Sequence, residues 1–267
     1  MPDFNNKTII ITGASEGIGR ALALELAPQG PRLVLAARNR ERLESLAREC
    51  AAAGATTLVC RCDVTGKADC ESLVKNSIDR FGRIDILVNN AGATMWAEFS
   101  EVSDLLVFRE LMDINYLGAV YCTHFALPHL LESRGLIVAV ASLAGLTGVP
   151  SRTGYAASKH AMVGFFESLR IELRGTGVGV SIIAPDFVVS QIHRRAIKGD
   201  GEIMGETPMQ EARIMSTEDC AALIAGAMRK RQRLLITSAR GKMGRWLKLI
   251  APGLIDRIAD RAIRLRR

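Results

Sequence analysis

The sequence predicts an α/β protein in which one doubly wound parallel sheet of about seven strands carries helices on both faces. Two observations predict this fold. Short runs rich in Val, Ile and Leu alternate with longer segments of helical pattern, which is the rhythm of repeated β-α-β units. The runs are apolar throughout instead of alternating with polar residues, as expected for strands that helices cover on both faces.

The elements follow in order along the chain. We expect strands at residues 7–12, 32–37, 56–62, 85–90, 135–142, 179–184 and 233–237. Helical patterns fill residues 18–30 and 40–54, the second with Gly54 as a stop signal, and a long helix lies within 152–175. Strands and helices that alternate in this way predict a Rossmann-like sheet.

Length and composition predict one large domain. The chain has 267 residues, of which 48% are hydrophobic and 24% charged, and it shows neither a linker-like tract nor a repeat. We expect a single catalytic domain over 1–239, with a substrate lid near 186–215, and a basic amphipathic extension over 240–267.

The first residues predict a cytoplasmic location, and the pattern of cysteines predicts no metal site. The first residues lack a basic stretch followed by a signal-type apolar run, and the apolar stretch 135–149 is shorter than the roughly 18 residues that a bilayer span requires. The six cysteines show no C-x2-C pair, so we predict neither a metal site nor a disulfide.

The stretch TGASEGIG, residues 12–19, fits two motifs. Gly13, Gly17 and Gly19 form a glycine-rich turn that lets a pyrophosphate approach the backbone at a helix N-terminus. Gly13 and Gly17 also flank Ser15 in a G-x-S-x-G pattern, the turn that presents a nucleophilic serine in hydrolases. Both motifs follow a strand and precede a helix, so the stretch alone leaves a dinucleotide enzyme and a hydrolase open.

The end of the second strand indicates which dinucleotide would bind. An NAD enzyme places Asp or Glu there for the ribose 2′-hydroxyl, whereas this chain has Arg38 and Arg40. A guanidinium pairs with a 2′-phosphate. The expected cofactor is therefore NADP.

Tyr155 and Lys159 lie four residues apart at the front of the long helix, hence on one face. A phenol ordinarily titrates near pH 10, and an ammonium about 4 Å away at an effective dielectric of about 20 favours the phenolate by roughly 4 kcal/mol. Such a pair is able to act as a general acid and base near neutrality.

Five motifs together resemble the short-chain dehydrogenase/reductase family and its hydroxysteroid dehydrogenase-like branch. They are the glycine stretch, Asn89 to Gly92 (NNAG), Asn115 within the pair Ile114-Asn115, Ser142, and Tyr155 with Lys159, in the family's order and spacing over about residues 7–236. The resemblance implies an NADP(H)-dependent oxidoreductase that interconverts a carbonyl and a secondary alcohol, on an apolar or lipid-like substrate. The nicotinamide of the cofactor would supply or accept the hydride.

The resemblance also implies roles for individual residues. Tyr155 would exchange a proton with the substrate oxygen, Ser142 would hydrogen-bond that oxygen, Lys159 would lower the tyrosine's pKa and hold the nicotinamide ribose, and Asn115 would position a water. The implied cofactor contacts are Gly13, Ser15, Glu16, Gly17, Ile18, Gly19, Arg38, Arg40, Asp63, Val64, Asn89, Ala91, Gly92, Tyr155, Lys159, Pro185, Val188 and Ser190.

One position departs from the family pattern. After the sixth strand the family usually has Pro-Gly, whereas this chain has Pro185-Asp186. The backbone path past the nicotinamide, including Val188 and Ser190, is therefore less firmly predicted. The polar, methionine-containing segment 191–215 reads as a mobile substrate lid.

Two other functions remain open at this point. A hydrolase would need Ser15 followed by an acid and a histidine, which Asp186 and His193 nominally supply. A dinucleotide-sensing protein without catalysis would leave the Asn-Ser-Tyr-Lys set unused. Neither accounts for all five motifs.

The tail and two long helices predict partners. Residues 240–267 contain nine Lys and Arg against two Asp, and an apolar stripe recurs every three or four positions at Leu247, Ile250, Leu254, Ile258, Ala262 and Leu265, interrupted at Pro252. We expect this segment to contact an anionic membrane surface peripherally, the alternative being packing on protein. Nucleic acid is not an expected partner. The helices near 116–131 and 155–174 predict a homodimer or homotetramer.

Overall fold

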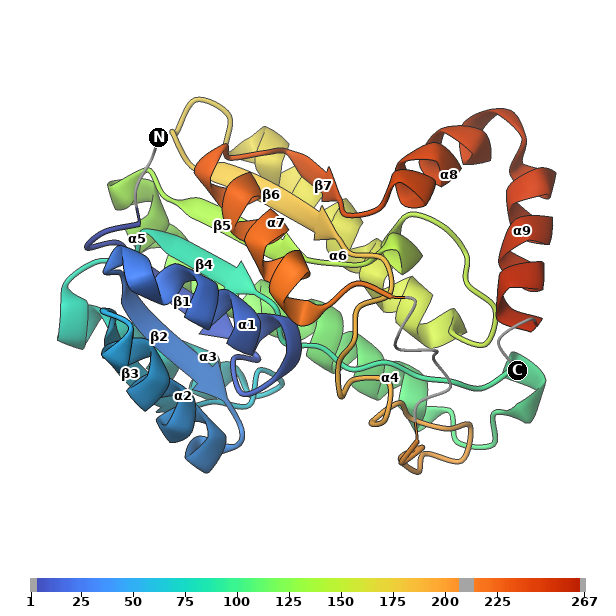
Figure 1. Cartoon of the computed structure of the whole chain (residues 1–267), viewed down its shortest axis with the longest axis horizontal. Helices are drawn as coiled ribbons and strands as arrows, with labels where there is room; N and C mark the ends of the chain where they lie inside the picture. Colours follow the sequence, from blue (N-terminus) through green and yellow to red (C-terminus); the bar gives the residue numbers. More distant parts are fainter. Residues whose placement is uncertain (1–3, 207–213, 265–267) are drawn as a thin grey trace.

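A computed structural model of the chain describes residues 4–206 and 214–264. Seven parallel strands form one sheet in the order β3-β2-β1-β4-β5-β6-β7 (Figure 1). The strands are β1 Thr8–Thr12, β2 Arg32–Ala37, β3 Thr56–Arg61, β4 Ile86–Asn89, β5 Leu136–Val140, β6 Gly179–Ala184 and β7 Leu234–Ile236. The predicted fold class is confirmed, and each strand lies within its predicted range.

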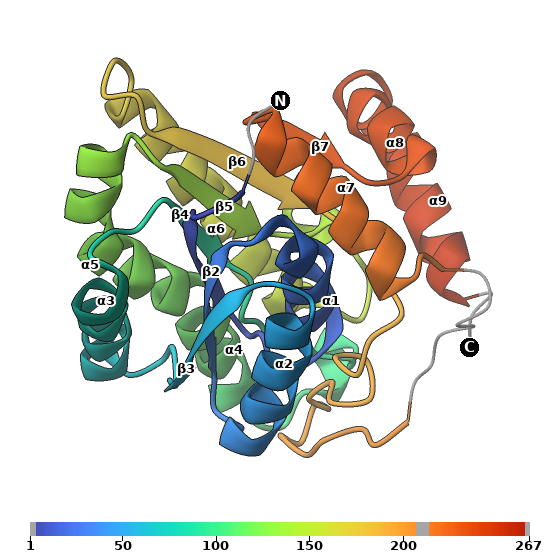
Figure 2. The same ribbon diagram turned by 60° about the vertical axis from the view of Figure 1, so that its left-hand side comes forward.

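Helices cover both faces of the sheet because each strand is apolar on both of its sides. In β1, Ile9 and Ile11 pack into the core on one face and Ile10 into the core on the other. Figure 2 shows α1, α2 and α7 on one side of the sheet and α3 and α5 on the opposite side. The helices are α1 Gly17–Leu26, α2 Arg40–Ala52, α3 Lys67–Phe81, α4 Leu106–Met112, α5 Gly118–Ser133, α6 Thr153–Glu172, α7 Thr217–Arg229, α8 Ala239–Ile250 and α9 Pro252–Arg264.

Helix ends follow local chemistry. The first helix ends earlier than predicted, at Leu26, because a 3₁₀ turn (η1, Ala27–Gln29) containing Pro28 follows it, and Gly30 closes that turn at φ +70°. After α2, Gly54 adopts φ +109°, a value that glycine tolerates without strain.

Three short helical turns interrupt the regular pattern. The 3₁₀ turns η2 (Phe99–Glu101) and η4 (Leu143–Gly145) follow β4 and β5, and a π-helical turn (η3, Asp113–Leu117) joins α4 to α5. Such π turns are frequent at functional sites. This one contains Asn115.

The C-terminal helices α8 and α9 pack on each other at one end of the molecule, beyond β7 (Figure 1). The helical conformation is interrupted between them at Ala251, before Pro252, where the sequence predicts an interruption. Within the described residues, no helix is both long and apolar enough to cross a bilayer. Ala262 and Leu265 of the predicted stripe lie outside the residues whose side chains are described.

All six cysteines are buried free thiols. Burial raises the pKa of Cys50 and of Cys60 to about 11. These thiols belong to the core.

Candidate active site and dinucleotide cleft

A cavity of about 800 Å³ opens at the carboxyl ends of the strands. It lies where β1 has β2 on one side and β4 on the other, so the chain leaves the sheet in opposite directions at this point. In doubly wound sheets this switch point is where ligands bind. The loops after β1, β2, β3, β4, β5 and β6 all contribute to its walls.

The glycine stretch forms the floor of one end of the cavity. Gly13 adopts φ +65°, and a Cβ there would lie 2.8 Å from the Cα of Ala91. The N-cap of α1, Glu16, is extended and makes no side-chain cap, so the first backbone N–H groups of the helix face whatever binds beside Gly17 and Ile18. This geometry fits a pyrophosphate.

The remaining residues of the stretch divide into two groups. Ser15 and Glu16 line the cavity with Gly13. Gly19 does not line it, because its Cα faces the backbone of Gly13, where a Cβ would collide with the carbonyl oxygen. Gly19 therefore permits the turn instead of touching a ligand.

Three arginines surround the end of β2. Arg38 is exposed and lines the cavity. Arg40 lies outside it, because its guanidinium bonds Glu44 at 2.8 Å along α2, so the predicted contact of Arg40 is not supported by this geometry. Arg42 lines the cavity instead and donates to Glu16 at 2.6 Å. Arg42 lies one helical turn after Asn39, and this spacing is the sequence signal from which its place in the cavity could have been predicted.

The central wall comes from the loops after β3 and β4. Asp63, Val64, Ala91 and Gly92 line the cavity. Asn89 does not, since it is 2% exposed and its amide donates to Thr123 at 2.9 Å. Asn89 therefore supports the wall from behind.

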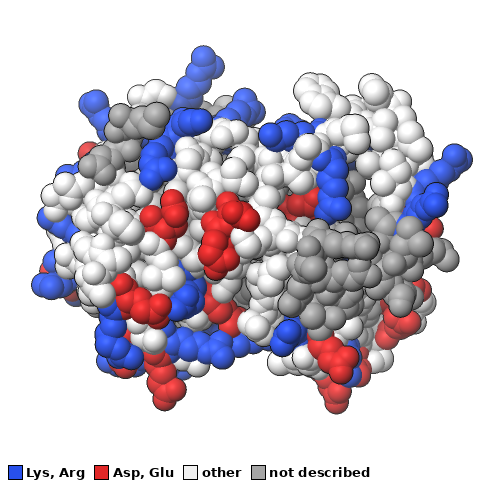
Figure 3. All heavy atoms as spheres, viewed as in Figure 1, with Lys and Arg blue, Asp and Glu red and all other residues white. Residues whose placement is uncertain are grey.

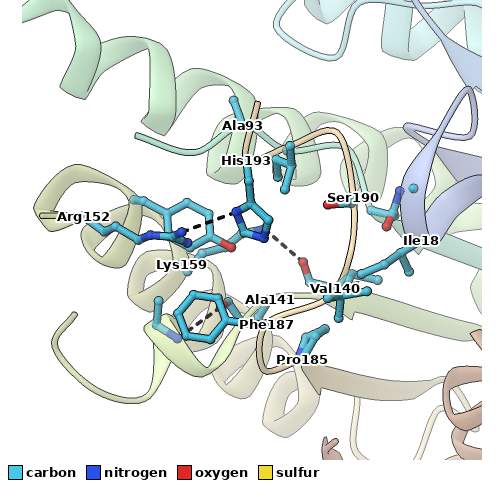
Figure 4. Close-up of a pocket in the computed structure, with 18 of the residues that line it drawn as sticks. Ile18, Ala93, Val140, Ala141, Arg152, Lys159, Pro185, Phe187, Ser190 and His193 are labelled. Carbon is cyan, nitrogen blue, oxygen red and sulfur yellow. Dashed lines mark hydrogen bonds between the residues drawn. The ribbon is translucent and has the colours of Figure 1, made fainter. Parts of the chain in front are cut away.

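Ser142, Tyr155 and Lys159 come together at the far end of the cavity. Ser142 follows β5, and the other two lie one turn apart at the start of α6. The Nζ atom of Lys159 donates to the Val140 carbonyl at 3.0 Å and lies 5.9 Å from the Tyr155 ring centroid. Figure 4 shows Lys159 and Val140 joined beside the cavity.

Burial and local contacts set the proton affinities here. Burial raises the pKa of Tyr155, while a hydrogen bond with Ser142 and the positive charge of Arg152 act to lower it. Burial lowers the pKa of Lys159 to about 8. The net result is a raised pKa, opposite to the lowering expected from Lys159, and the cation that acts against burial is Arg152, which the sequence reasoning missed.

Asn115 is fixed by three hydrogen bonds. Its Oδ1 accepts from the Ala93 N–H at 2.8 Å, and its amide donates to the Ala93 carbonyl at 2.9 Å and to Ser158 at 2.8 Å. Both amide protons are engaged. The side chain therefore clamps the loop after β4 to α6.

Pro185, Val188 and Ser190 line the cavity after β6, as does Asp186. The Asp186 carboxylate accepts from Ser238 at 2.7 Å and from Arg240 at 2.5 Å. Burial acts to raise the pKa of Asp186, but these hydrogen bonds leave it below its ordinary value. The aspartate in place of glycine thus joins this loop to the start of α8.

Arg152 and His193 are cavity residues that the sequence reasoning did not assign to the oxidoreductase site. They point toward one another across the cavity (Figure 4), with Arg152 Nη2 3.4 Å from His193 Nδ1. Because His193 lies against Arg152, and Asp186 bonds Ser238 and Arg240, the contacts of these residues are not those of a hydrolase triad with Ser15.

The described part of the predicted lid also lines the cavity. Ile197 pairs with Met95 and Ile203 through isolated β-bridges, and Val188 pairs with Met215. Residues 207–213, including Met209, lie outside the described residues.

A doubly wound sheet with a glycine turn and a Ser-Tyr-Lys group in one cavity is the design of a carbonyl–alcohol oxidoreductase. The family model described as short chain dehydrogenase matches residues 7–200. The chain belongs to this short-chain dehydrogenase/reductase family, in its hydroxysteroid dehydrogenase-like branch.

Individual relatives support this placement. The chain is 39% identical to 11-beta-hydroxysteroid dehydrogenase-like 4A of Arabidopsis thaliana, covering 94% of this chain and 83% of the relative. It is 36% identical to 11-beta-hydroxysteroid dehydrogenase A of Sesamum indicum, covering 95% and 74%.

Two solved structures are also similar. A short chain dehydrogenase/reductase from Burkholderia phymatum in complex with NAD has a TM-score of 0.84 at 29% identity, covering 95% of this chain and 96% of that one. An alcohol dehydrogenase from the archaeon Thermococcus sibiricus complexed with 5-hydroxy-NADP has a TM-score of 0.76 at 26% identity, covering 86% and 94%.

Proposed function

We propose that this oxidoreductase uses NADP(H) and interconverts an apolar ketone and its secondary alcohol, with Tyr155 as general acid and base. The observation that carries the proposal is the placement of Ser142, Tyr155 and Lys159 in the same cavity as the glycine stretch. The nicotinamide, when bound, supplies or takes up the hydride. The protein orients the partners and moves the proton.

In the reductive direction the phenol O–H bond of Tyr155 breaks and its proton goes to the substrate oxygen. Ser142, which lines the cavity with Tyr155 and acts to lower its pKa, donates to the same oxygen and orients it. Lys159 carries positive charge below about pH 8 and favours the phenolate that remains. In the oxidative direction the phenolate takes the proton of the alcohol.

Arg38 supports the preference for NADP. It is exposed on the cavity wall at the end of β2, and a second arginine, Arg42, lies beside Glu16 on the same wall. A guanidinium at this position pairs with a 2′-phosphate, whereas a ribose with two hydroxyls gains nothing from it.

The walls beyond Tyr155 support an apolar substrate. They are formed largely by aliphatic side chains of η4, the loop that follows it, the segment after β6 and α9: Leu143, Leu146, Val149, Ile197, Ile203 and Ile258. The names of the plant relatives refer to hydroxysteroids, which are apolar alcohols. We therefore expect a lipid-like carbonyl compound.

A screen of ketones with NADPH and NADH, followed by Tyr155→Phe, tests the function. General acid–base catalysis contributes roughly 10² to 10⁴ in rate, so the variant should lose that much turnover and bind NADP normally. Ser15→Ala should remain active. Turnover that survives in Tyr155→Phe, or covalent labelling of Ser15 by a fluorophosphonate, would contradict the assignment.

Assembly through α5 and α6 is a second part of the proposal. Ile171 on α6 is 71% exposed and Leu131 on α5 is 40% exposed, so apolar side chains of both long helices are available for contact with a second copy. We expect a dimer or tetramer by light scattering, and Ile171→Asp should weaken it. A wild-type monomer at micromolar concentration would exclude this assembly.

The α8–α9 pair supports peripheral contact with an anionic membrane. Met243, Trp246 and Leu249 are about 70% exposed on α8, and Figure 3 shows a largely uncharged surface over these helices with Lys and Arg side chains at its edges. Apolar residues flanked by cations are typical of helices that lie in a membrane interface.

Trp246→Glu with Leu249→Glu should reduce co-sedimentation with anionic vesicles. Leu105→Glu, which changes a side chain that is 69% exposed in the loop before α4, is the matched control. Equal recovery of both variants and the wild type with the vesicles would show that α8 does not bind membrane.

A further inference from the structure

Arg152 places a second cation beside Tyr155. It is the N-cap residue of α6, three positions before the tyrosine, and it is 4% exposed. Its Cζ atom lies 4.4 Å from the Trp96 ring centroid, 5.2 Å from that of Phe187 and 5.9 Å from that of Tyr155. The guanidinium is therefore held within an aromatic enclosure that includes the proposed acid and base.

The two cations lie at equal distances from the phenol ring. Lys159 Nζ is 5.9 Å from the Tyr155 ring centroid, the same as Arg152 Cζ. They differ in how long they stay charged, because burial lowers the pKa of Lys159 to about 8, whereas a guanidinium stays protonated throughout the range in which enzymes work. Above about pH 8, Arg152 is the cation that persists.

We propose that Arg152 is a positioning residue whose guanidinium, alongside Lys159, stabilises the ionised phenol of Tyr155. The inference rests on the proposed function, in which Tyr155 exchanges the proton. When the phenol O–H bond breaks and the proton moves to the substrate oxygen, the negative charge left on Tyr155 faces two cations. The hydride comes from the nicotinamide of the proposed function, and no other reactant is needed.

Other polar and charged groups lie around this part of the cavity. His193, from the segment after β6, faces Arg152, and Ser142 acts to lower the pKa of the phenol. Arg240, from α8, lies 6.0 Å from the Phe187 ring and is paired with Asp186. Glu110 of α4 lines the same cavity.

The interaction is large enough to measure. A unit charge about 6 Å away at an effective dielectric of about 20 changes the proton affinity of a phenol by roughly one to two pH units. Arg152 is also among the groups that act to lower the pKa of Tyr155 against its burial. Loss of the guanidinium should therefore raise the titration midpoint by about one unit or more.

The test is an NMR titration of the full chain, saturated with NADP and labelled with carbon-13 at tyrosine Cζ. The chain has three tyrosines, and Tyr155→Phe assigns the signal of interest. Arg152→Gln and Arg152→Met should raise the Tyr155 midpoint by about one unit or more, and Arg152→Lys should restore at least half of the difference. Arg170→Gln, which removes another arginine of α6 that binds backbone carbonyls, is the control and should leave the midpoint unchanged.

An unchanged Tyr155 midpoint in both neutral variants would overturn the proposal. In that case, an increase in KM confined to ketones that carry a carboxylate would show that Arg152 anchors the substrate instead. If neither neutral variant folds, Lys159→Met decides: with Arg152 in place the phenol should still titrate below about pH 12, and a phenol that stays protonated beyond that pH refutes the inference.

Failure of the proposed function has a different signature. Turnover that survives in Tyr155→Phe would remove Tyr155 from the reaction, whereas the NMR midpoint would still report whether Arg152 acts on the phenol. The two results are read from separate measurements.

Discussion

The two ends of the cavity are built in different ways. At the dinucleotide end, turns that leave buried parallel strands pack backbone against backbone, as where Gly13 meets Ala91. At the substrate end, α8 is attached to the body through a few contacts: Arg240 on Asp186, Gly241 against Leu143, and Lys248 on the Leu146 carbonyl at 2.8 Å. The main packing partner of α9 is α8.

This difference indicates where change is tolerated. Side chains cannot be added between two backbones in contact, so the dinucleotide end admits few sequences. Helices attached at their ends accept many sequences, so the substrate end can vary with the compound bound. Substitutions should therefore act severely at one end and mildly at the other.

The largest effect is expected at Gly13. Gly13→Val places a branched side chain at φ +65° and against Ala91, so NADP affinity should fall by at least about 100-fold. Gly82→Ala is the matched control, because it has a similar φ of +73° with open space around the added Cβ. It should lower stability by about 1 kcal/mol and leave NADP affinity unchanged when both variants are measured by fluorescence titration.

The next effect concerns the choice of dinucleotide. Arg38→Asp removes a charge-assisted pair worth roughly 1.5 to 3 kcal/mol, so the Kd for NADP should rise by one to two decades and NAD should become the better ligand. Arg40→Asp is a useful comparison, since Arg40 bonds Glu44 and does not line the cavity. A wild-type protein that binds NAD as tightly as NADP would show that Arg38 does not select the cofactor.

A smaller effect is expected from α9. Ile258 lines the cavity and is 49% exposed, whereas Leu254 is 47% exposed and does not line it. Ile258→Asn should raise KM for an apolar ketone about fivefold, corresponding to roughly 1 kcal/mol of lost apolar contact, while Leu254→Asn should not. Equal effects of the two substitutions would mean that α9 takes no part in the substrate wall.

The smallest effect is expected at Asp186. Its partner Arg240 is 57% exposed, so Asp186→Asn should cost no more than about 1 kcal/mol in urea unfolding near neutral pH. Because hydrogen bonding holds the pKa of Asp186 in the folded protein below its ordinary 3.8, the contribution is present above that pH and is lost as pH falls further. The difference between wild type and variant should shrink as the pH falls below 3.8. Hydrogen exchange in α8 should rise in the variant at pH 7.

The sequence predicts the dinucleotide end better than the substrate end. Each strand was predictable because a parallel strand buried on both faces must be apolar throughout, and the turn at Gly13 because its backbone geometry requires glycine. The direction of the Arg40 side chain was not predictable from the sequence. An arginine four residues before a glutamate in a helix can bond that glutamate as readily as it can face the cavity. Arg152 escaped notice because a lone arginine carries no pattern, and only the fold brings Trp96 and Phe187 around it.

The buried thiols make the protein a convenient host for site-specific labels. With the pKa of Cys50 and Cys60 near 11, and all six thiols inside the core, maleimide reagents at neutral pH have little thiolate to attack. A cysteine introduced at exposed Leu254 would then be the preferred attachment point for a fluorophore. Changes in its emission would report whether α9 moves relative to the cavity as ketone or dinucleotide binds.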